Sequence, residues 1–224
     1  MFTNARRVAG GLGVLGVILW AIAFGVGSGS PNTTDNNVKI VSWFSSSSHQ
    51  NTQIAAFLLF VVGALCILVF LSGLREQLAA AEGGAGLAPL AFGAGVAAVV
   101  LILSAVALFT APAFLIADAG MSVFVPNDFR TFNDAGYEFW VAASAVAALT
   151  VWSTSAVAFR TGVLPRWFAW FGVVVGIVQL LAVFFIPALI FWLWVVVASI
   201  LMLRAPGVPP AREPILAAEP GMQP

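Results

Sequence analysis

The chain has 224 residues and no net charge at pH 7, and 61% of its residues are hydrophobic while only 8% are charged. An ordinary soluble domain is about a quarter charged, so a water-soluble fold of this size could not cover its surface. No run of Lys or Arg is dense enough to indicate a face for nucleic acid, which excludes that class of partner.

The first apolar block extends from about residue 8 to residue 27, directly after Arg6 and Arg7. A helix rises ~1.5 Å per residue, so this block is long enough to cross a hydrocarbon core of ~30 Å. A basic start, an apolar run and Ala21-Ile-Ala23 are also typical of a cleaved signal peptide, which is the alternative reading. Residues 28–51 are rich in Ser, Asn and Thr and are expected to form a polar loop.

Two further apolar blocks, residues 52–73 and 87–111, predict the second and third spans. Pro112 marks the expected end of the third helix, because proline lacks the backbone donor and clashes with the preceding turn. Residues 113–125 then predict a short lip helix or an interfacial segment.

The next loop is expected to reach Tyr137. Thr131 and Asp134 have the spacing of a capping box, which predicts that the fourth span, residues 138–159, begins just after them.

The stretch from residue 167 to residue 203 is almost wholly apolar and would be about 55 Å long as one helix, nearly twice one hydrocarbon core. It must therefore fold back, and Pro187 is the breaker near its middle. We expect a fifth span at residues 167–185 and a sixth at residues 188–203. The proline-rich residues 205–224 are expected to be disordered.

The positions of the cations predict the orientation of this bundle. Seven of them fall on one side of the expected spans: Arg6, Arg7, Arg75, Arg160, Arg166, Arg204 and Arg212. Only Lys39 and Arg130 fall on the other side. Because positive residues stay in the cytoplasm, the sequence predicts an all-α polytopic membrane bundle of about six spans with both termini cytoplasmic. Eight arginines against one lysine, with abundant Ala, Gly and Val, are typical of high-GC bacteria, so a bacterial plasma membrane is the expected location.

Few residues suited to catalysis or to metal binding are present. Cys66 is the only cysteine and His49 the only histidine, which excludes an internal disulfide, a cysteine-based metal cluster and bis-histidine haem ligation. Nothing in the sequence indicates a cofactor or a metal ion.

Two glycine patterns have structural explanations. Gly11-Leu-Gly13-Val-Leu-Gly16 matches a dinucleotide fingerprint, but that motif works only in a turn between a strand and a helix, and here it lies in an apolar helix. Gly172 and Gly176 share one face of the fifth span, where small residues allow close helix packing. Packing within the chain is the main reading, and a homo-oligomer through this face is the alternative.

Candidate sites fall in two places. The expected outer loop supplies Asp118, Asp128, Arg130, Asp134 and Glu138, whose oxygens could bind a ligand or an ion. No charged residue lies centrally in a span, so an intramembrane site would rest on neutral groups, for which the candidates are Gln179, Ser144, Thr150, Ser153 and Thr154. Hydroxyls in membrane helices most often bond to their own backbone one turn back.

Residues 160–172, Arg160-Thr-Gly-Val-Leu-Pro-Arg-Trp167 followed by Phe168-Ala-Trp-Phe-Gly172, resemble a segment of an uncharacterised family of bacterial six-span membrane proteins, many of them actinobacterial. Asn133-Asp134-Ala-Gly136 is similar to the same group in a looser way. The resemblance implies that Arg160, Gly162, Pro165, Arg166 and Trp167 form the cytoplasmic turn between the fourth and fifth spans. It implies no catalytic residues.

Three hypotheses for the function follow. A non-enzymatic membrane or envelope component is favoured because no catalytic constellation is present. A carrier or channel for a small neutral solute is the alternative, and a lipid-modifying enzyme that uses the outer carboxylates is the third. The expected partners are the lipid bilayer and either a second copy or another membrane protein.

Overall fold

A computed structural model of the protein describes residues 2–83, 86–181 and 186–204, which form helices and contain no strand. In chain order the elements are α1 (Phe2–Gly27), α2 (Asn37–Phe44), α3 (Ser47–Glu82), α4 (Ala88–Ala119), the 3₁₀ turn η1 (Met121–Val123), α5 (Pro126–Thr161), α6 (Arg166–Gln179) and α7 (Ile186–Arg204). The predicted all-α fold is confirmed.

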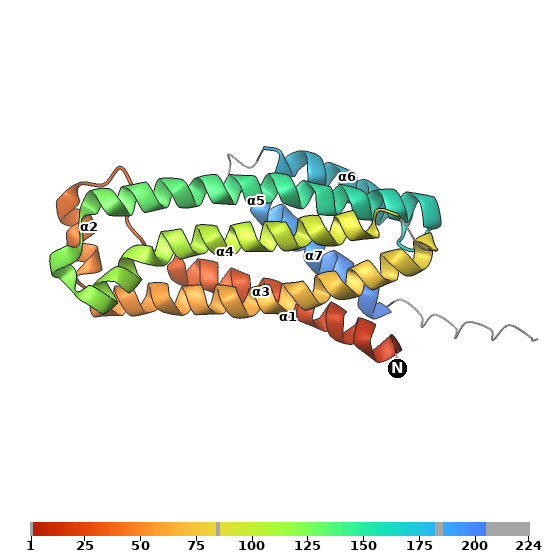
Figure 1. Ribbon diagram of the computed structural model, residues 1–224, viewed down its shortest axis with the longest axis horizontal. Coiled ribbons are helices and arrows are strands. Elements are labelled where there is room, and N and C mark those ends of the chain that lie inside the picture. Colours follow the sequence, from red (N-terminus) through yellow and green to blue (C-terminus); the bar gives the residue numbers. More distant parts are fainter. Residues whose placement is uncertain (1, 84–85, 182–185, 205–224) are drawn as a thin grey trace, which may run out of the picture.

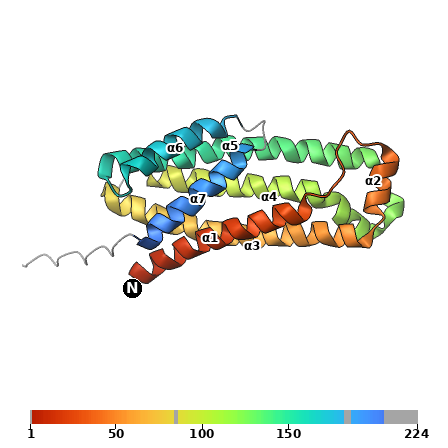
Figure 2. The ribbon, with the colours of Figure 1, turned by 180° about the vertical axis from the view of Figure 1, so that it is seen from behind.

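The six longer helices form a ring. α1, α3, α4, α5, α6 and α7 pack on one another in that order, and α7 packs back on α1 to close the ring. Consecutive helices run in opposite directions, so the start of α1 and the end of α7 lie at the same end of the bundle (Figures 1 and 2). We call this the terminal end and the opposite end, where α2 lies, the cap end.

Five helices in the described part of the chain are long and apolar enough to cross a membrane, one fewer than the predicted number of about six. The exception is α6, whose 14 residues span only about 21 Å. The predicted fifth span, residues 167–185, is therefore too long: its helix ends at Gln179, and residues 182–185 lie outside the described residues. An unbroken apolar run carries no marker of such an end, and Pro187 lies in the first turn of α7, where proline is tolerated.

Three helices extend well past the predicted spans, α4 and α5 mainly towards the cap end and α3 at both of its ends. α3 and α5 each have 36 residues and α4 has 32, which gives lengths of about 48–54 Å. The predicted end of the third span at Pro112 is wrong, because α4 continues through this buried proline to Ala119. The packing of Ala113 and Ile116 in the cap compensates for the backbone bond that proline removes.

Two predicted loops are largely helical. The polar loop at residues 28–51 contains α2, which Asn36 caps by accepting a hydrogen bond from the Lys39 N–H, and the first turn of α3. The predicted capping box lies inside α5, which begins at Pro126. Thr131 instead donates to the Asn127 carbonyl of its own helix, at 3.0 Å. The polar composition of these segments argues against a position in hydrocarbon. It does not prevent them from forming helices.

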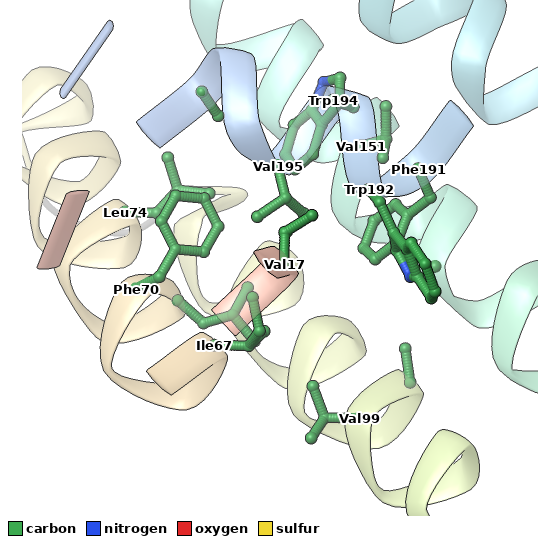
Figure 3. Packing of buried hydrophobic residues seen from close by; sticks show 14 of the residues in the cluster. Val17, Ile67, Phe70, Leu74, Val99, Val151, Phe191, Trp192, Trp194 and Val195 are labelled. Carbon is green, nitrogen blue, oxygen red and sulfur yellow. The ribbon is translucent and has the colours of Figure 1, made fainter. Parts of the chain in front are cut away.

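The main hydrophobic core fills the interior of the ring. Figure 3 shows Val17 of α1, Ile67 and Phe70 of α3, Val99 of α4 and Trp194 of α7 in this cluster. The N-terminal span is part of the same core, because Trp20 is fully buried and donates its indole N–H to the Phe60 carbonyl at 3.0 Å.

A second, separate cluster lies at the cap end, beyond the ring. Its buried residues come from α2, α4 and α5 and from the turn between the last two: Ile40, Phe44, Ala113, Ile116, Phe124 and Phe129. We call this cluster the cap core.

The cations separate between the two ends. The terminal end holds the beginnings of α1 and α6 and the ends of α3, α5 and α7. These segments carry Arg6, Arg7, Arg166, Arg75, Arg160 and Arg204. Lys39 and Arg130 lie at the cap end, whereas Arg212 and the whole predicted tail, residues 205–224, lie outside the described residues. The cytoplasmic location of the terminal end stays a prediction.

Candidate binding pocket

A pocket with a volume of about 440 Å³ lies at the cap end of the ring. It is bounded by the last turns of α1, by the outer parts of α3, α4 and α5, and by residues 28–33. It forms there because α6 and α7 cover less of the bundle's length than α3, α4 and α5 do (Figure 2). Pockets of this size are typical of sites for small ligands.

The pocket is lined by aromatic residues, which we call its floor, and by uncharged polar residues, which we call its mouth. Its aromatic residues are Phe24, Phe60, Phe109 and Trp140. Its polar residues are Ser28, Ser30, Asn32, Thr33, Gln53, Thr110 and Asn133, and no charged residue of the described chain lines it. The arrangement suits a molecule that is apolar at one end and carries uncharged hydrogen-bonding groups at the other.

Some polar groups of the pocket are used within the protein and others are not. Gln53 donates from Nε2 to the Gly27 carbonyl at 3.1 Å, and Thr110 donates to the Val106 carbonyl at 2.8 Å. Among the described residues, the side-chain amides of Asn32 and Asn133 make no hydrogen bond. These two amides are therefore available to a ligand.

Residues 28–36 form a roof over the pocket, and Arg130 of α5 holds it in place. The Arg130 guanidinium donates from Nε to the Thr33 carbonyl and from a terminal nitrogen to the Asp35 carbonyl, both at 2.8 Å. Asp35 in turn pairs with Lys39 at 2.8 Å and accepts a hydrogen bond from the Asn32 N–H at 2.9 Å. The Lys39 and Asn32 hydrogen bonds lower the pKa of Asp35 from its ordinary value.

Replacing Arg130 with methionine is expected to loosen the roof. Hydrogen bonds to charged groups contribute about 1.5–3 kcal/mol, so amide exchange in residues 28–36 should accelerate by about tenfold or more. Arg130→Lys should restore little, because a lysine ammonium lacks the planar fork that reaches two carbonyls. Hydrogen–deuterium exchange measures this, with Arg160→Met at the terminal end as control; unchanged exchange in Arg130→Met would show that Arg130 does not hold the roof.

The predicted outer-loop residues do not converge on the pocket. Asp118, Asp128, Asp134 and Glu138 are exposed, and none of them lines it. The described residues contain no group of three or more His, Cys, Asp or Glu side chains placed to hold a metal ion. Arg130, predicted as a ligand residue, is instead bonded to the roof.

The predicted intramembrane residues are buried but only partly brought together. Gln179 and Ser144 line one small void of about 10 Å³ beneath Trp140, which is about the space of one water. Gln179 donates from Nε2 to the Pro187 carbonyl, while its Oε1 is buried without a partner.

The remaining predicted hydroxyls lie farther along the buried face of α5, and only that of Thr154 bonds to its own helix. Thr154 donates to the Thr150 carbonyl at 2.8 Å, and the hydroxyl of Thr150 itself is buried without a partner. Ser153 is also buried. None of these three lines either pocket.

The predicted glycine faces pack inside the chain. A side-chain atom at Gly172 would collide with Ser155 of α5, and one at Gly176 would collide with Trp152. Gly13 and Gly16 lie in the same way against Phe70 and Ile67 of α3. Since α5 already covers the Gly172 and Gly176 face, that face is closed to a second copy of the chain.

The motif that carries the resemblance forms a turn at the terminal end. Gly162 ends α5 with a φ of 70°, a left-handed conformation that favours glycine. Its backbone N–H donates to the Ala158 carbonyl at 3.0 Å. Pro165 precedes α6, and Trp167 is 57% exposed beside Arg166. The geometry is that of a tight turn between α5 and α6.

Sequence reasoning missed the pocket. Its polar residues fall in separate predicted segments: Asn32 and Thr33 in a loop, Gln53 at the start of the second span, and Asn133 before the fourth span. No sequence pattern indicated that these segments meet. The one usable signal was that four neutral polar residues flank the expected outer ends of three spans.

The chain matches no protein-family model, no curated protein and no solved structure. The fold and composition define its class: it is an all-α, multi-pass membrane protein, with five helices suited to crossing a bilayer in the described part of the chain.

Proposed function

We propose that this protein is a non-enzymatic component of a bacterial plasma membrane that binds a small, uncharged amphipathic molecule in the pocket at the cap end. The cap lies outside the cell in this proposal and both termini lie in the cytoplasm. Membership of the six-span family with the Arg-x-Gly-x-Leu-Pro-Arg-Trp turn is part of the proposal.

The pocket itself carries the proposal. It combines about 440 Å³ of space with four aromatic side chains and with the amides of exposed Asn32 and half-buried Asn133, which make no hydrogen bond within the described part of the chain. A mainly apolar pocket with a few free polar groups is typical of a site for a small ligand.

The alternatives find less support in the same geometry. A lipid-modifying enzyme should bring at least two carboxylates into an outer cleft, and the described lining contains none. A carrier needs a route past the pocket floor, where Trp140 and Trp192 leave only the void of about 10 Å³. Gln179 in that void is the one observation that favours transport.

Filling the pocket is expected to abolish binding. Gly27 lines the pocket, and a Cβ there would meet Ala56 at an ordinary contact distance of 3.5 Å, so the Gly27→Leu side chain should enter the pocket without breaking the fold. Photo-crosslinking with a diazirine-bearing long-chain alcohol should label residues 53–60 and 106–110 in the native protein. The labelling should fall at least fivefold in Gly27→Leu.

Gly25→Leu is the matched control, because a Cβ at Gly25 has nothing within 4 Å and the substitution stands on the same helix. Its labelling should equal that of the native protein. Labelling spread evenly over the lipid-facing helices, and equal in both variants, would contradict the proposed binding function.

A further inference from the structure

We propose that the ligand is an uncharged, hydroxyl-bearing membrane lipid that enters the pocket sideways, between α1 and α5, from the surrounding bilayer. This inference rests on the proposed function and adds the source and class of the ligand. Three features carry it: the side of the pocket that the described helices leave uncovered, the apolar side chains exposed on both flanks of that side, and the chemistry of the mouth.

The described helices leave one side of the pocket uncovered, and we call this side the opening. α1 and α5 are not adjacent in the ring, and α6 and α7 join them over only part of their length. Figure 2 shows α7 starting short of the cap end while the ribbons of α1 and α5 continue past it. Beyond that start, α3 and α4 close the back of the pocket and residues 28–33 close the top. Among the described residues, the remaining side faces outwards.

Large apolar side chains are exposed on both flanks of the opening. On α1, Phe24 lines the pocket, while Ile22 and Val26 are 49% and 40% exposed at the same height. On α5, Trp140 lines the pocket and its neighbour Phe139 is 40% exposed. These exposed apolar side chains are suited to contact with lipid tails. A ligand that enters between them therefore comes from the bilayer.

The mouth selects against an ionised head group. The described lining has no charged side chain to balance a phosphate, and Arg130, one turn before Asn133, already donates to Thr33, Asp35 and Asn127. The amides of Asn32 and Asn133 can instead donate to and accept from hydroxyl and ester oxygens. Burying an unpaired charge beside the aromatic floor would be costly, which favours an uncharged lipid.

Native mass spectrometry of the full chain, released from nanodiscs that contain equal amounts of dioleoylglycerol and dioleoyl-phosphatidylglycerol, tests the inference. We expect diacylglycerol to be retained at least tenfold over the phosphatidylglycerol. Gly27→Leu should abolish this retention and Gly25→Leu should not. Asn133→Leu should reduce the retention of diacylglycerol about tenfold. If Gly27→Leu fails to fold, Asn133→Leu still tests the inference.

Free glycerol and glucose, added in water at millimolar concentration, test whether the ligand comes from water and not from the bilayer. If they protect an Asn133→Cys thiol from a maleimide and the lipids do not, the lipid source is wrong while the binding function stands. Equal retention of the anionic lipid would overturn the selectivity for an uncharged ligand. If no probe binds the native chain, both this inference and the proposed function fail.

Discussion

Phe44→Ala is expected to unfold the cap and leave the bundle folded. Phe44 is 1% exposed, and its ring lies 5.0 Å from that of Phe124 and 5.5 Å from that of Phe129. Removing a buried phenylalanine costs about 3–5 kcal/mol, which is a large share of what so small a cluster can supply. Hydrogen–deuterium exchange should show α2 and residues 113–129 losing protection.

The control for this variant is Val38→Ala on the same helix, because Val38 is 78% exposed and should change stability by less than about 0.5 kcal/mol. The helical content of the bundle, measured by circular dichroism, should fall only slightly in Phe44→Ala, since the cap core and the main core share no buried residue. Loss of protection throughout the bundle would show that the two clusters fold as one unit.

Gly63→Val is expected to separate α1 from α3 and to lower the free energy of unfolding by about 3 kcal/mol, the upper end of what overpacking usually costs. A Cβ at Gly63 would lie 2.5 Å from the Trp20 ring and 3.0 Å from the Gly16 carbonyl. The added side chain must therefore displace Trp20 and break its bond to the Phe60 carbonyl. Unfolding in detergent, followed by tryptophan fluorescence, measures the loss.

Gly11→Val serves as the matched control for Gly63→Val. A Cβ at Gly11 has nothing within 4 Å, and valine is a better helix former than glycine by a few tenths of a kcal/mol. This variant should be as stable as the native protein or slightly more stable. If the two variants unfold at the same detergent concentration, the close approach of α1 to α3 does not limit stability.

The prediction succeeded where one residue property decides the structure. The segment around Gly162 was expected to form a turn between two helices, and Gly162 ends α5 there with a positive φ, because only its own backbone is involved. Gln179 was placed inside an apolar span, and it is 1% exposed, because an amide has no partner in lipid.

The prediction failed where distant residues decide the structure. Pro112 does not end α4, because the turns after it pack against Phe124 and Phe129, which follow the helix in the chain. This packing stabilises the extra turns. The pocket was not foreseen, since its polar residues lie in four separate segments. The roles predicted for Asp118, Asp128, Asp134 and Glu138 stay predictions, and the structure places them on the exposed surface.

By itself, the sequence determined that this chain forms apolar helices whose cations gather at one end, because a backbone in hydrocarbon must satisfy its own hydrogen bonds and charges must avoid lipid. Only the tertiary structure decided that α6 is too short to span, that three helices extend past the bundle to build a cap, and that a pocket remains between α1 and α5. These features depend on contacts between side chains of different helices, and the hydropathy of the sequence does not predict such contacts.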